Sequence, residues 1–146
     1  MKKLTMALVS LLVLYQASAA EGEWLTDLAK AKEKAKTEKK MILMYFTGSD
    51  WCPPCKALHK NILTSTEFVE YARKNLILVE VDFPNNKPQS PELKKANAEL
   101  AKKFDIDGYP TVIVLDSSGK ELSKRAGYGG EKTGDFIARI EALKKG

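Results

Sequence analysis

Apolar side chains follow two patterns along this chain, a helical spacing in some segments and short unbroken runs in others. Between residues 24 and 40 they recur at helical spacing, with Thr26 or Asp27 near the start, which predicts a helix with one buried face. Residues 41–47 are apolar almost without interruption, as is typical of a strand that is buried on both faces. Because such a strand needs covering helices, the pattern favours an α/β fold.

The rest of the chain continues this alternation of helices and strands. Pro53 and Pro54 suit the first turn of a helix that continues to Leu63, because a missing N–H costs little there. The segment Thr64-Ser65-Thr66-Glu67 has the form of a capping box, with Thr64 as the N-cap of the next helix. Further strands are predicted at 76–83, 111–115 and 121–126, and further helices at 91–104 and around 136–143.

The connections between these elements set the expected topology. Helices link the early strands, which favours parallel pairing, whereas the short turn 116–119 joins the last two strands as an antiparallel hairpin. We therefore expect one α/β domain with a mixed parallel and antiparallel central sheet and helices on both faces.

The first twenty residues differ from the rest and are predicted to be a secretory signal peptide. Two lysines precede the apolar stretch Leu4–Tyr15, and small residues end the segment. Its twelve positions fall short of the ~20 that a membrane-spanning helix needs, which argues against a retained anchor. We expect a signal peptide over 1–20 and a single domain over 21–146. The domain is expected to be exported to the periplasm or another extracytoplasmic compartment, without stable membrane insertion after cleavage.

The net charge of the chain bears on which macromolecules it could bind. The formal charge of +5 falls to +3 once Lys2 and Lys3 are removed. The lysines between positions 30 and 40 alternate with Ala and Glu, as on the solvated face of a helix. This mild excess does not predict a nucleic-acid partner, and we expect a monomer.

The most informative residues are the only two cysteines, Cys52 and Cys55, which lie between a predicted strand and a predicted helix. A disulfide between them would close so small a loop that it would stabilise the fold by only about 2 kcal/mol. At the start of a helix, the unpaired N–H groups and the helix dipole favour a thiolate over a thiol. We therefore predict a redox-active disulfide in which Cys52 is the nucleophile, within reach of solvent, and Cys55 the resolving thiol. Asp50 is expected beside the helix start, where its charge would slightly disfavour the thiolate.

Two motifs together resemble the thioredoxin-like superfamily, and the resemblance extends over nearly all of the chain after the predicted signal peptide. They are Trp51-Cys52-Pro53-Pro54-Cys55-Lys56 and Gly108-Tyr109-Pro110-Thr111. The resemblance implies a three-layer fold and a cis Tyr109–Pro110 bond beside the reactive sulfur. We expect Trp51, Tyr109 and Pro110 to bind the substrate.

Two departures limit this resemblance. Many thioredoxins have a buried acid on the first strand beneath the cysteines, whereas this chain has Met44-Tyr45-Phe46 there. A proton for Cys55 must then come from water, Lys56 or a group of the substrate. Family members also often have a proline in the active-site helix, and its absence at Leu58-His59-Lys60 predicts a straighter helix.

The dipeptide between the cysteines bears on the direction of electron flow. Neither Pro53 nor Pro54 has a backbone N–H, so two potential donors to the Cys52 sulfur are missing. Weaker stabilisation of the thiolate favours the disulfide form, which makes the pair a better reductant. We therefore expect an exported thiol-disulfide oxidoreductase that is more a reductase or isomerase than an oxidase. It would act on protein thiols and disulfides with a separate redox partner and without a cofactor.

A binding module is the alternative to an enzyme. Cys52, Cys55 and His59 could ligate copper or zinc, as in a metal carrier or a redox-linked chaperone without turnover. No fourth ligand is evident in the sequence, so an exposed or packed helix histidine is the simpler interpretation, and we expect no metal.

Overall fold

The computed structural model describes residues 22–146, and the predicted signal peptide over 1–20 lies outside the described residues. No helix within 22–146 is long and apolar enough to span a bilayer. The elements are β1 (Trp24–Leu25), α1 (Leu28–Glu38), β2 (Met41–Thr47), α2 (Pro53–Leu58), the π-helical turn η1 (His59–Leu63), α3 (Thr66–Asn75), β3 (Leu76–Asp82), α4 (Pro91–Lys103), β4 (Thr111–Leu115), β5 (Glu121–Ala126), α5 (Thr133–Ala142) and the 3-10 turn η2 (Leu143–Lys145).

The strands form one mixed sheet in the order β1-β3-β2-β4-β5. β3 pairs in parallel with β1 and β2, and β4 is antiparallel to both β2 and β5. A helical crossover between β2 and β3 and a short hairpin between β4 and β5 account for these directions, as the sequence predicts. Every residue of the central strand β2 is buried, whereas most of the edge strand β5 is exposed.

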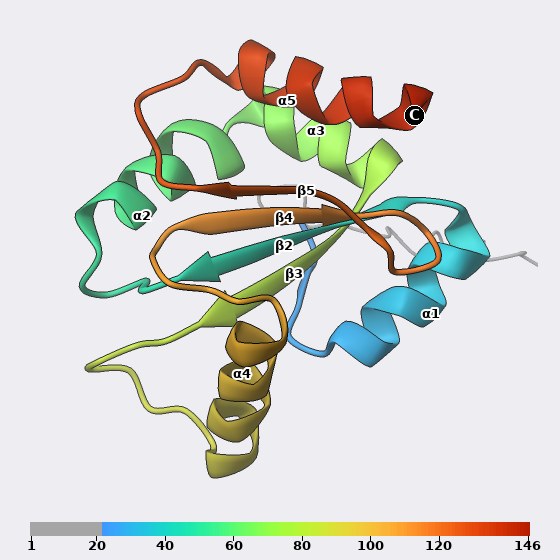
Figure 1. The fold of residues 1–146 in the computed structure, drawn as a ribbon. Coiled ribbons are helices and arrows are strands. Elements are labelled where there is room, and N and C mark those ends of the chain that lie inside the picture. The colour runs from blue at the N-terminus through green and yellow to red at the C-terminus, as the bar shows by residue number, and fades with distance from the viewer. Residues whose placement is uncertain (1–21) are drawn as a thin grey trace, which may run out of the picture.

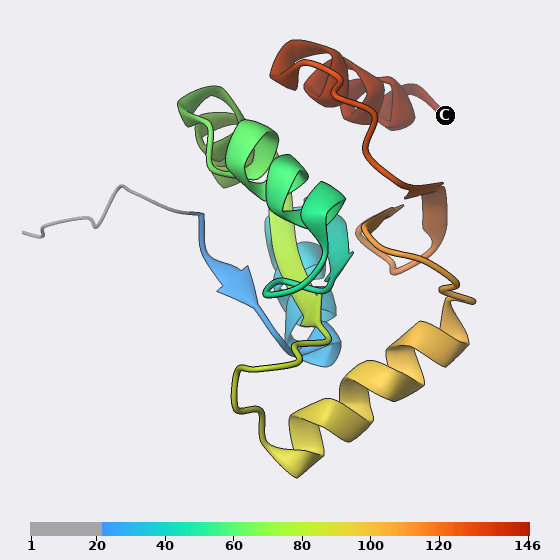
Figure 2. The same ribbon diagram turned by 90° about the vertical axis from the view of Figure 1, so that its left-hand side faces the viewer.

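Helices cover both faces of the sheet, which confirms the three-layer α/β arrangement (Figures 1 and 2). On one face α2, η1, α3 and α5 pack over the strands, around an edge-to-face pair of Phe68 and Phe136 with ring centroids 5.7 Å apart. On the other face, α1 and α4 cover Phe46 and its neighbours. Because side chains alternate along β2, Tyr45 faces the first layer and Phe46 the second.

The helix begins at Asp27 as predicted, but Trp24 and Leu25, which fit its apolar spacing, lie outside it. Trp24 and Leu25 instead form β1, a short edge strand beside β3. The helix begins at Asp27 because the side chain of this residue accepts the backbone N–H of Ala29 at 2.9 Å and that of Lys30 at 3.3 Å. The sheet therefore has one strand more than the sequence pattern indicates.

The active-site helix is not α-helical throughout, and the expectation that it is straighter stays a prediction. α2 gives way to η1, in which the N–H of Thr64 donates to the carbonyl oxygen of His59, five residues back, at 3.0 Å. The Thr64 hydroxyl bonds to the carbonyl oxygens of His59 and Lys60, both at 3.1 Å. Thr64 thus ends this helix, and the predicted capping box is displaced by one residue: Ser65 caps α3 by accepting the N–H of Phe68 at 3.2 Å.

Candidate active site

The two cysteines lie beyond the carboxyl end of β2 and form a disulfide, with their Cα atoms 5.2 Å apart. Cys52 is the N-cap residue of α2, so it occupies the leading end of the helix as predicted. In this oxidised form Cys52 is 3% exposed and Cys55 1%, so the expectation of a solvent-accessible sulfur at position 52 is wrong for the disulfide state.

One backbone donor within α2 serves the Cys52 sulfur. The N–H of Cys55 donates to Sγ of Cys52 over 3.3 Å, and the two prolines fill the first two helical positions. Since proline has no N–H, the donors that other residues would present at these positions are missing. The helix end therefore stabilises a thiolate less than an end with all its donors would.

Trp51 stands next to the disulfide and is 41% exposed. Its indole lies over Gly48, where a Cβ atom would collide with the ring. The indole Nε1 donates to the carbonyl oxygen of Phe83 at 2.7 Å, and the ring meets that of Tyr109 edge-on with centroids 5.9 Å apart. The structure thus brings together two of the predicted substrate-binding residues, Trp51 and Tyr109, and holds the exposed indole in place.

The loop before β4 contains the cis bond between Tyr109 and Pro110 that the resemblance implies. The carbonyl oxygen of Pro110 accepts the N–H of Gly127 at 2.7 Å, which ties this loop to the end of β5. Within residues 22–146, the backbone N–H and carbonyl of Tyr109 take part in no hydrogen bond. An unpaired stretch of backbone therefore lies beside the exposed indole.

Asp50 lies two residues before the N-cap Cys52, beside the helix start as expected, and it also binds a loop. Its carboxylate accepts the backbone N–H groups of Asn85, Asn86 and Lys87 at 2.9, 2.7 and 3.1 Å. These bonds lower the pKa of Asp50. Asp50 therefore positions the loop after β3, from which Nζ of Lys87 donates to the Ser49 hydroxyl at 3.1 Å.

A cavity of about 200 Å³ adjoins Cys55, at the carboxyl ends of β2 and β3. The Tyr45 hydroxyl donates to the carbonyl oxygen of Cys55 at 2.8 Å and accepts the hydroxyl hydrogen of Thr47 at 3.0 Å. Burial raises the pKa of Tyr45 to about 12, so its phenol keeps its proton at neutral pH. The other polar residues that line the cavity are Ser49, Lys56, His59, Glu80 and Lys87.

Glu80 is a candidate that the sequence analysis missed. It pairs in register with Tyr45, and strand alternation places it on the same helix-covered face. Burial, and to a smaller extent the charge of Asp82, raises the pKa of Glu80, while the charges of His59 and Lys87 oppose this rise. The sequence signal was an acid on the buried face of an otherwise apolar strand, where an unpaired charge is costly.

The metal-binding alternative finds no support in this geometry. The two cysteines are bonded to each other, and the His59 side chain is exposed. Across residues 22–146, no three His, Cys, Asp or Glu side chains form a group that could hold a metal ion.

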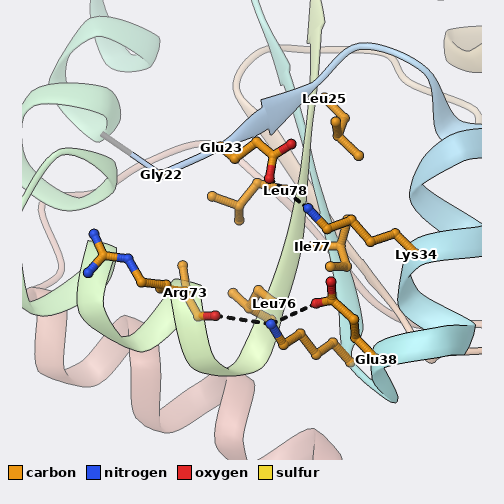
Figure 3. Close-up of a pocket in the computed structure, with 11 residues that line it drawn as sticks. Gly22, Glu23, Leu25, Lys34, Glu38, Arg73, Leu76, Ile77 and Leu78 are labelled. Carbon is orange, nitrogen blue, oxygen red and sulfur yellow. Dashed lines mark hydrogen bonds and ion pairs between the residues drawn. The ribbon is translucent and has the colours of Figure 1, made fainter. Parts of the chain in front are cut away.

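A second cavity, of about 250 Å³, lies at the start of β3 (Figure 3). Lys34 pairs there with Glu23 at 2.6 Å. Lys40 pairs with Glu38 at 2.8 Å and donates to the carbonyl oxygen of Arg73 at 3.0 Å. The seven residues of β2, about 20 Å in length, separate this end of the sheet from the end with the disulfide. Because no cysteine lines this cavity, it is distinct from the redox site.

The three-layer fold and a disulfide at the leading end of a helix define a thioredoxin-like thiol-disulfide oxidoreductase. The profile of the thioredoxin-like domain family matches residues 28–144, and the chain belongs to this family.

Relatives with curated names agree with this assignment. The chain is 34% identical over 128 residues to the disulfide bond reductase DsbH of Chlamydia pneumoniae, a match that covers 88% of this chain and 76% of DsbH. It is 31% identical over 120 residues to the thioredoxin-related protein DsbJ of the same organism, covering 80% of this chain but only 34% of DsbJ. Among solved structures, a DsbH oxidoreductase matches with a TM-score of 0.79 and 32% identity, over 93% of each chain.

Proposed function

We propose that the protein is an exported, monomeric reductase or isomerase of protein disulfides, in which Cys52 is the nucleophile and Cys55 the resolving thiol. The Cys52 thiolate attacks a substrate disulfide, a mixed disulfide forms, and Cys55 displaces the reduced substrate. A separate redox partner then reduces the Cys52–Cys55 disulfide. The observation that carries the proposal is the position of the Cys52 sulfur at the N-cap of α2.

The direction of the reaction rests on the donors to that sulfur. Only the N–H of Cys55 reaches it from the first turn, because Pro53 and Pro54 occupy the two positions before. A less stabilised thiolate gives up electrons more readily, which favours a reductase or isomerase over a strong oxidase. The name of the relative DsbH, a disulfide bond reductase, is in line with this direction.

The substrate surface is assigned to Trp51, Tyr109 and Pro110. The unpaired backbone of Tyr109 offers hydrogen bonds to an extended segment around the substrate cysteine. The exposed indole of Trp51 offers apolar contact beside it. Substrates are therefore proteins whose disulfides lie in segments that can adopt an extended conformation.

Trapping of the intermediate tests the assignment of the two cysteines. Cys55→Ala, expressed as the full chain, should accumulate covalent adducts with exported proteins that a reducing agent releases and mass spectrometry identifies. The matched control is the double variant Cys52→Ala, Cys55→Ala, which has no nucleophile. Adducts no more abundant than in this control, or adducts confined to cytosolic proteins, would contradict the proposal.

The direction needs its own measurement. Equilibration of the purified protein with glutathione buffers should give a redox potential well below the value of about −120 mV that characterises strongly oxidising disulfide donors. A potential near that value would refute the reductase or isomerase assignment while leaving the exchange mechanism intact.

A further inference from the structure

Resolution of a mixed disulfide requires that Cys55 lose its proton, yet this residue is 1% exposed. A buried thiol needs a nearby group that can accept the proton, because the thiolate is the attacking species. Among the groups that line the adjoining cavity, Lys56 and Lys87 have no free lone pair as ammonium ions. Tyr45 already directs its hydroxyl hydrogen at the Cys55 carbonyl. Glu80 and His59 remain as acceptors.

Glu80 is the better placed of these two groups. It projects from β3 opposite Tyr45, so the sheet fixes its position, whereas His59 is exposed at the start of η1. The Glu80 carboxylate takes part in none of the ion pairs found within residues 22–146, so no cation is bonded to its oxygens there. The cavity that it shares with Cys55 measures about 200 Å³, and a water molecule takes up about 30 Å³ of liquid volume, so water can bridge the two groups.

We propose that Glu80 is the acid–base group of Cys55 and exchanges its proton through the shared cavity. The inference rests on the proposed roles of the two cysteines. The S–H bond of Cys55 breaks and the proton passes to the carboxylate. The sulfur electron pair then forms the bond to Sγ of Cys52, while the bond between Cys52 and the substrate sulfur breaks and the substrate leaves as a thiolate. The cysteine pair is thereby oxidised and the substrate disulfide reduced.

The surroundings make Glu80 a stronger base than an exposed glutamate. Burial raises the pKa of Glu80, and an acceptor with a pKa closer to the working pH is a more effective base. The groups that face it come from every element around the cavity: Tyr45 from β2, Lys56 from α2, His59 from η1, Asp82 from its own strand and Lys87 from the following loop. Asp82 adds to the rise, whereas His59 and Lys87 oppose it.

A two-phase thiol titration isolates the step. When the reduced protein is mixed with excess 5,5′-dithiobis(2-nitrobenzoate) in a stopped-flow instrument, Cys52 releases one equivalent of chromophore at a rate set by reagent concentration. Cys55 then releases the second equivalent of chromophore at a rate that does not depend on the reagent concentration. In Glu80→Gln the second phase should slow at least about tenfold near pH 7 with the first phase unchanged, because a positioned base contributes roughly a hundredfold or more. The rates of the two proteins should converge at high pH, where hydroxide removes the proton of Cys55 without a base from the protein.

Matched variants separate a proton-transfer role from a structural one. Glu80→Asp keeps the carboxylate and should recover part of the rate, and Glu121→Gln on the exposed strand β5 should match the wild type. A second phase that is the same in Glu80→Gln and wild type at every pH would overturn the inference. The inference would also be overturned if the rate of the second phase lost its pH dependence in His59→Gln but kept it in Glu80→Gln, because His59 would then be the base.

If Glu80→Gln does not fold, the variant Lys87→Met tests the acid–base role of Glu80 instead. Removal of this cation should raise the pKa of Glu80, so the midpoint of the pH profile of the second phase should move to higher pH, and an unmoved midpoint would refute the inference. In the wild type, the absence of a second phase would refute the roles proposed for the cysteines, and with them that of Glu80. A second phase whose rate is the same in the Glu80 variants as in the wild type would refute only the role of Glu80 and leave those of the cysteines intact.

Discussion

The indole of Trp51 donates a hydrogen bond of 2.7 Å to the carbonyl oxygen of Phe83. This bond fastens the turn before the cysteines to the residue that follows β3. The ring of Phe83 in turn packs against Tyr109, with centroids 5.3 Å apart. Three chain segments therefore meet in one aromatic surface beside the disulfide, and its shape depends on the placement of Trp51.

Gly48→Ala should displace that indole. The added Cβ would overlap the six-membered ring of Trp51, so the side chain must turn away and lose its bond to Phe83. We expect a red shift of the Trp51 fluorescence and a loss of about 1–3 kcal/mol in the free energy of unfolding, measured by urea denaturation. Gly129→Ala is the matched control, because a Cβ there meets no atom within 4 Å. Equal spectra for the two variants would contradict the assigned packing.

Asp50→Ala should release the loop after β3. Three backbone N–H groups, those of residues 85–87, lose their acceptor, so these amides should exchange with deuterium faster than in the wild type. Because the pKa of Asp50 is lowered in the folded protein, its stabilising effect should be present above the ordinary Asp pKa and be lost as the pH falls through the lowered value. Asp50→Asn retains one oxygen acceptor and should be intermediate. Unchanged exchange in Asp50→Ala would show that the loop is held by other contacts.

Asn97→Asp should destabilise the protein at neutral pH. Asn97 is 1% exposed, and its Nδ2 donates to the carbonyl oxygen of Asp82 at 3.0 Å. A carboxylate would set an unpaired charge against that oxygen, at a cost of about 3 kcal/mol in the free energy of unfolding. Asn97→Leu removes the bond without adding charge and should cost about 1 kcal/mol. Because the folded state disfavours the charged form, the pKa of the new carboxyl is raised, so the excess cost should shrink as the pH falls through this raised value and be absent below about pH 4, the ordinary Asp pKa. Equal stability of the two variants at pH 7 would refute this.

Glu80 should also affect how stability depends on pH. Its raised pKa means that the folded state holds the proton more tightly than the unfolded state does. The contribution to stability is then complete below the ordinary Glu pKa and is lost as the pH rises through the raised value. Relative to Glu80→Gln, the wild type should therefore lose stability from about pH 4 upward, as measured by urea denaturation at several pH values. A constant difference between the two proteins would show that the carboxyl is solvated as in the unfolded chain.

The apolar runs of the sequence were sufficient to predict β2, β3 and β4, because each is a short apolar run that is almost continuous. β5, with the sequence ELSKRA, has no such run and was predictable only as the second strand of a hairpin after the turn at 116–119. β1 was missed because Trp24 and Leu25 also fit the helical spacing of the residues after them, and two residues are too few to show alternation. The helix start at Asp27 was within the range predicted.

The site was predictable where its chemistry is local in sequence. The spacing of Cys52 and Cys55 and the helical pattern that follows them are sufficient to predict a redox site. The roles of Asp50 and Glu80 were not predictable in this way, because each depends on a segment far away in the chain. Asp50 binds a loop 35 residues later, and Glu80 lines the same cavity as Cys55 because β2 and β3 pair in a particular register. Pairing between distant segments leaves no periodic signal in the sequence.

The flanks of the sheet also matter for a protein that handles the cysteines of other chains. One edge strand of the sheet, β1, has only two residues. The other edge strand, β5, has the exposed charged residues Lys124 and Arg125. Short or charged flanks resist the addition of a foreign strand. An unfolded substrate protein that binds near the disulfide therefore meets no long apolar edge strand within residues 22–146 with which it could form a β-sheet. This favours its release over aggregation.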